Sequence, residues 1–430
     1  MIHTDYAVIG AGLTGAAAAW RLAADGNDVT VLERTIPAND LGSSHGSARI
    51  FRYAYAEELY TELVQQSKVG WDELEALSGR QLITPTGAVD FGGIRDPEGL
   101  SRVLTESGVE NELLTESDAE ARFEGFDFDT SVLWHPGAGV IDAHNSVAAM
   151  LDLATADGAT VLTGWDVSRI TAADSGYLLT SATGDEVHAE NLIVCAGGWL
   201  PDLLRELPIP DEFLAAFPAL EVTQEQAYHF PYRDVSQAGS WPTFIYKSDE
   251  IQVYGLPGGR DADGRGQKVA EYAAGRHIGS AAHHDKVLDP ANRERVIAFV
   301  REFLPGLDPT PYAETTCLFT MTPNEDFVID RVDGITVLSP CSGHGAKFAP
   351  LLGRFAADLA TGAAGAEDIP AIFRPSRELM GRDLMGRDLM GRDLMGGASD
   401  GVPGVPAPTP TPAGADVTKP DQASSTGDPE

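Results

Sequence analysis

The chain has 430 residues, enough for two domains with substantial cores, and its hydrophobic fraction of 43% is ordinary for a globular protein. Its formal net charge of −35 opposes binding to nucleic acid and to anionic membranes. No apolar run approaches the length of a membrane span and no secretory signal opens the chain, so we expect a cytoplasmic protein. The three cysteines (Cys195, Cys317, Cys341) indicate neither a disulfide framework nor a metal site, and the histidines show no metal-ligand spacing.

The first third of the chain opens with a strand–helix–strand unit. Residues 6–9 form a short apolar run, residues 14–24 are rich in Ala and Leu, and residues 28–33 form a second strand-like run. A loop rich in Gly and Ser follows at residues 42–46. Apolar residues at helical spacing then predict a helix over residues 57–77.

The middle of the chain predicts more strands than helices. We expect strands at 86–91, in a second system over 160–179, at 191–198 before a glycine turn, and through the region 221–254. A helix is expected at 292–303, and residues 317–330, 336–339 and 349–361 predict a strand, a strand and a helix.

From Arg377 the chain changes character. Arg-Glu-Leu-Met-Gly is followed by three copies of Arg-Asp-Leu-Met-Gly that end at Gly396, and residues 397–430 are rich in Gly, Pro, Ala, Thr and Asp. Such composition is typical of disorder, so residues 376–430 are excluded from the fold. A tolerated repeat expansion and a partner-docking tail both remain open for this segment.

A glycine-rich loop predicts a dinucleotide site. Gly10, Gly12 and Gly15 form the pattern G-x-G-x-x-G between a strand and a helix, and Glu33 ends the next strand. Gly10 permits a tight turn, Gly12 lets the backbone approach a pyrophosphate, and Gly15 allows close packing of helix on strand. Glu33 can accept hydrogen bonds from ribose hydroxyls.

The loop alone does not decide between NAD and FAD. A second signal is the strand over residues 192–198, which ends in Ala-Gly-Gly far downstream of the first unit. In flavoproteins with two dinucleotide-binding segments, such a strand brings the chain back to the cofactor. An ordinary buried strand would have the same sequence pattern, so both interpretations stay open.

Four segments together carry a resemblance that covers roughly residues 3–375. They are the opening glycine loop, residues 42–52, residues 317–330 and residues 342–348. In order and spacing they resemble the family of monomeric sarcosine oxidase and N-methyltryptophan oxidase, within the D-amino-acid-oxidase-like flavoproteins. The resemblance implies an α/β fold with a Rossmann-type FAD-binding domain and an inserted, mostly antiparallel α+β substrate domain. It divides the chain into residues 1–80, 141–220 and 315–375 for FAD and residues 81–140 and 221–314 for substrate.

The resemblance also assigns catalytic residues. Arg52 and Lys347 match the pair that grips the substrate carboxylate, which a buried acid group requires. Arg49, one helical turn before Arg52, is expected to face the flavin. Lys268 matches the lysine beside the flavin, whose ammonium would stabilise the negative charge that develops on oxygen. Tyr254 matches a tyrosine that lines the substrate pocket.

The cofactor assignments centre on Cys317, which matches the cysteine that forms a thioether with the flavin 8-methyl group. Cys195 and Cys341 lack such a context and are expected in the core. His45 and His344 match flavin contacts, but each is equally compatible with a structural hydrogen-bonding role. The full cofactor set is Gly10, Gly12, Gly15, Glu33, Ser44, His45, Arg49, Val167, Cys317, Gly343, His344, Gly345 and Lys347.

Two departures from the family pattern bear on the substrate. Phe319 stands where the family often has Tyr, and Tyr272 stands where sarcosine oxidases place His. A bulkier or more apolar N-methyl or cyclic amino acid is therefore at least as good a candidate as sarcosine.

The resemblance implies a monomeric FAD-dependent oxidase of N-methyl (secondary) amino acids that gives an imine or aldehyde and hydrogen peroxide. Its partners are then a small amino acid and molecular oxygen. Three alternatives stay open: oxidation of cyclic imino acids such as pipecolate or proline, a same-fold dehydrogenase with a carrier acceptor, and a flavin-bearing interaction protein.

Overall fold

Two large sheets organise the protein, whose computed structural model describes residues 1–376. The first sheet has eight strands in the order β10-β11-β12-β1-β2-β9, with β20 beside β12 and β19 beside β20. Its strands are β1 (Ile2–Ile9), β2 (Val29–Glu33), β9 (Thr160–Thr163), β10 (Val167–Ala172), β11 (Tyr177–Ser181), β12 (Glu186–Val194), β19 (Val328–Val332) and β20 (Ile335–Ser339). The central strands β12, β1, β2 and β9 run parallel.

Both faces are buried in the central part of this sheet, which explains the apolar runs in β1, β2 and β20, whereas β9 and β10 are largely exposed. Tyr6 and Val8 of β1 pack into one core cluster, whereas Ala7 and Ile9 pack into another on the opposite face. The first cluster lies under the four helices α1 (Leu13–Ala24), α2 (Glu58–Ser78), α5 (Ala143–Ala156) and α9 (Ala349–Thr361). The predicted strand–helix–strand unit and the helices at 57–77 and 349–361 are thus confirmed.

The second sheet has nine strands and is mostly antiparallel. Its order is β17-β13-β16-β15-β14-β5-β7-β6, with β18 beside β13, and only β14 and β5 pair in parallel. The strands are β5 (Ala88–Phe91), β6 (Glu112–Leu114), β7 (Val132–His135), β13 (Glu221–Pro231), β14 (Thr243–Lys247), β15 (Gln252–Pro257), β16 (Gly266–Glu271), β17 (Arg276–His277) and β18 (Ala313–Met321). The helix α8 (Pro290–Phe303) contributes Phe299 to an aromatic core beside this sheet.

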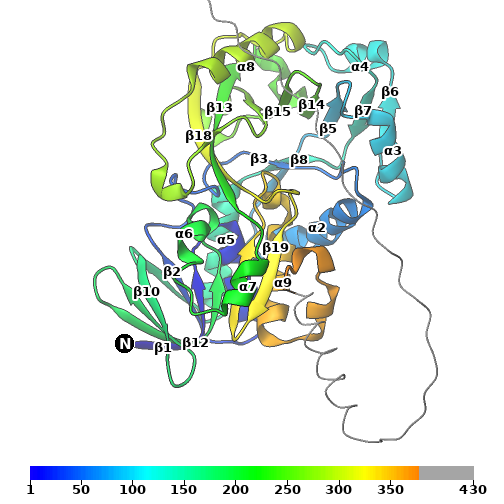
Figure 1. Ribbon diagram of the computed structural model, residues 1–430. Helices are drawn as coiled ribbons and strands as arrows, with labels where there is room; N and C mark the ends of the chain where they lie inside the picture. The colour runs from blue at the N-terminus through cyan, green and yellow to red at the C-terminus, as the bar shows by residue number, and fades with distance from the viewer. Residues whose placement is uncertain (377–430) are drawn as a thin grey trace, which may run out of the picture. The chain divides into compact units, whose positions relative to one another are not determined.

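A small sheet lies between the two large ones in Figure 1. It consists of β3 (Arg49–Phe51), β8 (Gly139–Ile141) and β4 (Ile83–Pro85), and β3 leads directly to Arg52. The remaining helices are α3 (Pro97–Glu106), α4 (Glu116–Arg122), α6 (Leu200–Leu203) and α7 (Asp211–Ala216).

One predicted strand is wrong. Residues 317–330 are not a single strand, because β18 ends at Met321 in the nine-stranded sheet and β19 begins at Val328 in the eight-stranded sheet. Pro323 interrupts the ladder because it has no N–H, and Glu325 has a φ of 62°. This segment therefore joins the two sheets instead of extending one of them.

The proposed division into two domains stays a prediction. Its boundary at residue 315 falls inside β18, and residues 1–376 all belong to one compact unit. The tail from Arg377 lies outside the described residues.

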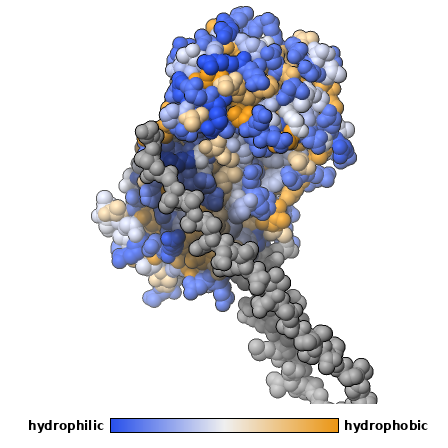
Figure 2. All heavy atoms as spheres, turned by 45° about the horizontal axis from the view of Figure 1, so that its top comes forward, coloured by the Kyte–Doolittle hydropathy of each residue, from blue (hydrophilic) through white to orange (hydrophobic). Residues whose placement is uncertain are grey.

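The surface of the described residues agrees with the acidic composition of the chain. Hydrophilic residues predominate on the face that Figure 2 shows. Among residues 1–376 no helix is long and apolar enough to cross a membrane.

Candidate active site

A single cavity of about 990 Å³ brings most of the predicted site residues together. It extends from the glycine loop of the eight-stranded sheet to the inner side of the nine-stranded sheet. The predicted residues on its wall are Gly10, Gly12, Glu33, Ser44, Arg49, Arg52, Val167, Tyr254, Lys268, Cys317, Gly343, His344, Gly345 and Lys347. Gly15 and His45 are the two predicted residues that do not line it.

The end of the cavity that Gly10 and Gly12 line is called the nucleotide end here, after the predicted dinucleotide site. It is built mainly from backbone. Gly10 has a φ of 100°, and a Cβ atom there would lie 2.6 Å from the carbonyl oxygen of Cys195. Gly12 precedes α1 without a side-chain cap, so the amide groups of the first helical turn face this end of the cavity. A Cβ atom on Gly15 would overlap the carbonyl oxygen of Gly10, which explains why only glycine fits there.

These features fit a dinucleotide phosphate, since helix N-termini bind anions and glycine lets them approach. Glu33 lines the cavity at the end of β2, and its Oε2 accepts a hydrogen bond from the Ala11 amide at 2.9 Å. The Ser44 hydroxyl oxygen accepts from the Leu13 amide at 3.0 Å and thereby fixes the loop against the helix start. The role of Glu33 towards a ribose stays a prediction.

The strand that ends in Ala-Gly-Gly returns to this place, as predicted. β12 pairs in parallel with β1, and Ile9 lies opposite Val194. Cys195 follows directly, and burial raises the pKa of its thiol to about 12. A thiol with so high a pKa is unreactive. Cys195 packs against the first core cluster, but Cys195 and Cys341 also line the main cavity, so neither is a pure core residue as predicted.

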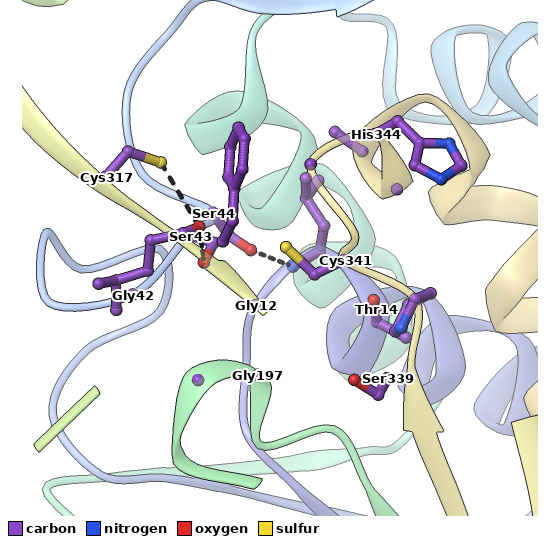
Figure 3. Close-up of a pocket in the computed structure, with 18 of the residues that line it drawn as sticks. Gly12, Thr14, Gly42, Ser43, Ser44, Gly197, Cys317, Ser339, Cys341 and His344 are labelled. Carbon is purple, nitrogen blue, oxygen red and sulfur yellow. Dashed lines mark hydrogen bonds between the residues drawn. The ribbon is translucent and has the colours of Figure 1, made fainter. Parts of the chain in front are cut away.

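Cys317 lies on β18 at the wall of the cavity (Figure 3). Arg49 Nη2 lies 3.9 Å from its sulfur and 3.0 Å from the Ser43 carbonyl oxygen, so a cation stands beside the thiol. Arg49 belongs to the strand β3, and the expectation that it lies one helical turn before Arg52 is wrong. Residues three apart on an extended chain point to opposite sides, which separates Arg49 from Arg52.

The other end of the cavity, lined by Arg52, Tyr55 and Lys347, is called the substrate end here. Lys347 starts a chain of hydrogen bonds there. Its Nζ donates to the Tyr55 hydroxyl at 2.9 Å and to the His344 carbonyl at 2.6 Å. The His344 ring lies between the Tyr55 hydroxyl at 2.9 Å and the Glu325 carbonyl at 3.1 Å. A carbonyl only accepts, so Nε2 is the donor and Nδ1 accepts from Tyr55.

The charges of this end follow from burial. Burial, and then the charge of Lys347, lower the pKa of His344 to about 3, so the ring is neutral as the hydrogen bonds require. Burial, and then Arg52, lower the pKa of Lys347 well below its usual value. The Arg52 guanidinium stacks over Tyr55, with its carbon 4.4 Å from the ring centre. Two cations therefore flank one tyrosine.

Lys268 lies on β16 between β13 and β15 and is only 6% exposed. Burial, and then the charge of Arg49, lower its pKa to about 8, against the opposing effects of Cys317 and Asp261. The structure thus places a buried lysine on the same cavity wall as Tyr254 and Cys317.

His45 lies on a second cavity of about 380 Å³, together with His229 and Asp261. Asp261 accepts a hydrogen bond from the Ser47 amide at 3.0 Å. Burial is the main cause that lowers the pKa of His45 to about 3. No cluster among residues 1–376 is arranged to hold a metal ion. The flavin contact of His45 stays a prediction.

Sequence reasoning missed three residues of the substrate end, namely Tyr55, Arg95 and Lys247, which all line the main cavity. Arg95 is anchored by Asp90, a fully buried carboxylate in the strand β5. A charged residue inside an apolar strand run, and a lysine in a chain that has only six, are the signals that could have found them.

The comparison with protein families decides the broad assignment. The model of the family described as "FAD dependent oxidoreductase" matches residues 5–359. The chain belongs to this family of FAD-dependent oxidoreductases. The predicted family, enzyme class and fold class are thereby confirmed.

Individual relatives agree with this family. A monomeric sarcosine oxidase from Streptomyces avermitilis is 32% identical over 402 residues, which cover 87% of this chain and 97% of the relative. An N-methyl-L-tryptophan oxidase from Yersinia pestis is 29% identical and covers 82% of this chain and 94% of its own. Among solved structures, NikD, an unusual amino acid oxidase essential for nikkomycin biosynthesis, superposes with a TM-score of 0.72 at 25% identity, over 86% of this chain and 96% of that one.

Proposed function

We propose that this FAD-dependent oxidoreductase oxidises N-methylated amino acids with molecular oxygen as the acceptor. The observation that carries the proposal is that Arg52 and Lys347 meet at one cavity, which also holds Cys317 and the glycine loop. The two curated relatives described above are named for oxidation of sarcosine and of N-methyl-L-tryptophan. Both of those substrates are N-methylated amino acids.

The substrate carboxylate would lie between Arg52 and Lys347. Lys347 uses two of its N–H groups on Tyr55 and on the His344 carbonyl, which leaves the third for a carboxylate oxygen. Arg52 adds a guanidinium, and charge-assisted bonds of this kind are the strong ones in a buried site. Because Tyr55 and His344 hold Lys347 in place, binding of the substrate carboxylate there would also orient the N-methyl carbon for reaction.

The overall reaction is balanced with oxygen and water as co-reactants. The N-methyl group would lose a hydride, which carries both electrons, and bound FAD would supply the acceptor for it. The resulting imine takes up water and gives the demethylated amino acid and formaldehyde, while oxygen takes the two electrons and two protons and leaves as hydrogen peroxide. The protein positions the substrate and excludes water from the reacting bond.

Cys317 and Lys268 take the finer roles in this proposal. A covalent link from Cys317 to FAD is supported by the position of its sulfur on the cavity wall and by Arg49 beside it. Activation of oxygen by Lys268 is supported by its burial on the same wall, where a fixed ammonium can stabilise negative charge on oxygen. A cytoplasmic location is supported by the three cysteines, none of which forms a disulfide in the described residues. The monomeric state stays a prediction.

Two measurements test the proposal. The purified protein is denatured in acid and digested, and the yellow chromophore is expected on the peptide that contains Cys317. A Cys317→Ser variant should release its flavin on the same treatment, which makes it the matched control. Release of free flavin from the unaltered protein would refute the covalent link to Cys317, but it would not contradict the proposed reaction.

The reaction itself is tested by peroxide production with a panel of N-methyl and cyclic amino acids. Peroxide with N-methyl substrates is the expected result. Activity confined to pipecolate or proline would move the substrate class to cyclic imino acids. Flavin reduction without peroxide, relieved by an artificial electron acceptor, would mean a dehydrogenase.

A further inference from the structure

The lysines of this acidic chain are distributed in an unusual way. Five of its six lysines lie in residues 1–376, and two of these pair with surface carboxylates: Lys68 with Asp72, and Lys286 with Asp40. The other three have no carboxylate within 4 Å in the part of the chain that the structure describes, and all three line the main cavity: Lys247, Lys268 and Lys347. Only the last two have a role in the proposed reaction.

Lys247 is held at the substrate end by its strand. It ends β14, and the two preceding residues of this strand, Ile245 and Tyr246, also line the cavity. Its Nζ lies 5.3 Å from the centre of the Tyr272 ring, and the residue is half-buried. Burial, and then the charges of Arg95 and Arg52, lower the pKa of Lys247. Both guanidinium groups thus act on the charge of Lys247.

Arg52 and Arg95 are also close to each other. Both donate to the carbonyl oxygen of Ala54, Arg95 over 3.0 Å, so two guanidinium groups share one neutral acceptor. The Arg95 side chain is 8% exposed, and its single carboxylate partner is the fully buried Asp90 at 2.6 Å. His135 lies 3.4 Å from the same carboxylate. Among residues 1–376, Asp90 is thus the only carboxylate within 4 Å of a group of four basic side chains, made up of Arg52, Arg95, Lys247 and Lys347.

The carboxylates at the mouth of the cavity do not balance this group. Glu57 and Glu325 line the cavity but are exposed, and Asp326 is half-buried and accepts a hydrogen bond from Tyr60 at 2.7 Å. None of the three comes within 4 Å of the four basic side chains among residues 1–376, although Glu325 partly offsets the lowering of the Lys247 pKa. Glu325 instead accepts a hydrogen bond from Tyr272 at 3.1 Å. Unpaired cations in a partly buried site are costly unless an anion joins them. One substrate carboxylate would occupy Arg52 and Lys347 and leave Lys247 without a partner.

We propose that the substrate is an N-methyl amino acid with a second acidic group on its side chain, which Lys247 binds beside Arg95. This inference rests on the proposed function and narrows its substrate class to N-methylated dicarboxylic amino acids. The α-carboxylate lies at Arg52 and Lys347, and the side-chain carboxylate reaches the end of β14. Ile245 and Tyr272 line the space on this side of the cavity.

The test compares each acid with its neutral amide of nearly the same shape. Values of kcat/KM are measured by peroxide production for Nα-methyl-L-glutamate against Nα-methyl-L-glutamine, for Nα-methyl-L-aspartate against Nα-methyl-L-asparagine, and for sarcosine. At least one acid should exceed its amide about tenfold or more, the size expected for a partly buried charge pair. Acid-to-amide ratios near one for both pairs would overturn the inference.

Variants of Lys247 assign that preference to one side chain. Lys247→Met should bring the acid-to-amide ratio close to one, whereas Lys247→Arg should keep most of it. Lys68→Met removes the same charge at an exposed ion pair and should leave every kcat/KM value unchanged. Flavin absorbance of each variant reports folding, and if Lys247→Met does not fold, the ratio in Lys247→Gln is measured instead. A ratio that survives loss of the ammonium would overturn the inference.

The outcomes also separate this inference from the function on which it rests. If sarcosine or another neutral N-methyl amino acid reacts without any preference for acids, only the dicarboxylic class is wrong. If no N-methyl amino acid yields peroxide or reduces the flavin, the proposed function fails and the inference fails with it.

Discussion

The two ends of the main cavity bind by different means. At the nucleotide end, Gly10 and Gly12 bring backbone to the surface, and the first turn of α1 supplies amide groups. At the substrate end, the wall carries charged side chains such as Arg52, Arg95 and Lys347, which come from segments far apart in the sequence. In the proposed function, backbone would recognise what all dinucleotides share, whereas the side chains would decide which acid enters.

This difference predicts where substitutions should act. A change at the nucleotide end should alter how much flavin the protein holds and how stable it is, with every substrate affected alike. A change at the substrate end should leave flavin in place and alter kcat/KM for particular substrates. The following predictions test this separation.

The largest effect is expected from Arg52→Ala. The substitution leaves a buried substrate carboxylate with Lys347 alone, and losing one partner of such a pair costs about 2–5 kcal/mol. We therefore expect kcat/KM for N-methyl amino acids to fall by about 30- to 5,000-fold, at unchanged flavin content. Steady-state kinetics and the flavin absorbance per protein measure both quantities.

Arg102→Ala is the control for Arg52→Ala, since it removes an exposed guanidinium from the surface helix α3. It should change neither quantity. An Arg52→Ala protein that loses flavin in proportion to activity would contradict the separation of the two ends. A fall in kcat/KM of less than threefold would show that Arg52 does not bind the substrate carboxylate.

The next effect concerns Lys268. Lys268→Met removes a buried positive charge from the cavity wall, and loss of one preorganised charge-stabilising group typically costs about 10²–10³-fold in rate. We expect the reaction of reduced enzyme with oxygen to slow by this factor in stopped-flow mixing. Lys286→Met at the surface should react normally.

The pH dependence gives the Lys268 prediction a sign. The ammonium exists below its pKa, which burial and Arg49 lower to about 8. The rate of the unaltered enzyme with oxygen should therefore fall as the pH rises through about 8, while the rate of Lys268→Met stays flat there. A parallel decline in both proteins would place the titrating group elsewhere.

The same contrast explains how much of this protein could be predicted from its sequence. The glycine loop, Glu33 and the returning strand at Cys195 follow from local patterns, because backbone recognition needs residues that are close along the chain. Arg52 and Lys347 were predicted from the family resemblance, because they lie in two of the segments that carry it. Their meeting in space depends on β3 and on the turn before α9, which no local pattern describes.

The residues that were missed are those whose role arises only from packing. A role for Lys247 cannot be inferred from the sequence, because it depends on the pairing of β14 with β15 and on the position of Lys247 at the cavity. The buried pair of Asp90 and Arg95 depends on a contact across a loop, and β18 and β19 separate because a short proline-containing turn passes from one sheet to the other. Packing of this kind, whether between distant strands or across a short loop, is what periodicity and motif spacing leave undetermined.

The smallest effect on substrate preference is expected from Gly10→Ala, which tests the nucleotide end. Gly10 has a φ of 100°, and an added Cβ would lie 2.6 Å from the Cys195 carbonyl oxygen, an atom that cannot move without shifting β12. Gly26 offers a matched control, because it has a φ of 85° with nothing within 4 Å of an added Cβ. Gly26→Ala should cost only the backbone strain, about 1–2 kcal/mol of unfolding free energy.

Gly10→Ala should cost that strain and about 1–3 kcal/mol more from the close contact, and its flavin content should fall. Denaturant unfolding of both variants, followed by protein fluorescence, measures the difference between them. Equal losses would mean that only backbone conformation selects glycine at position 10. Because the substrate end lies elsewhere on the cavity wall, the kcat/KM ratio between two substrates should stay the same in the flavin-loaded fraction of Gly10→Ala. A shift in that ratio would show that the two ends are coupled through β1 and β12.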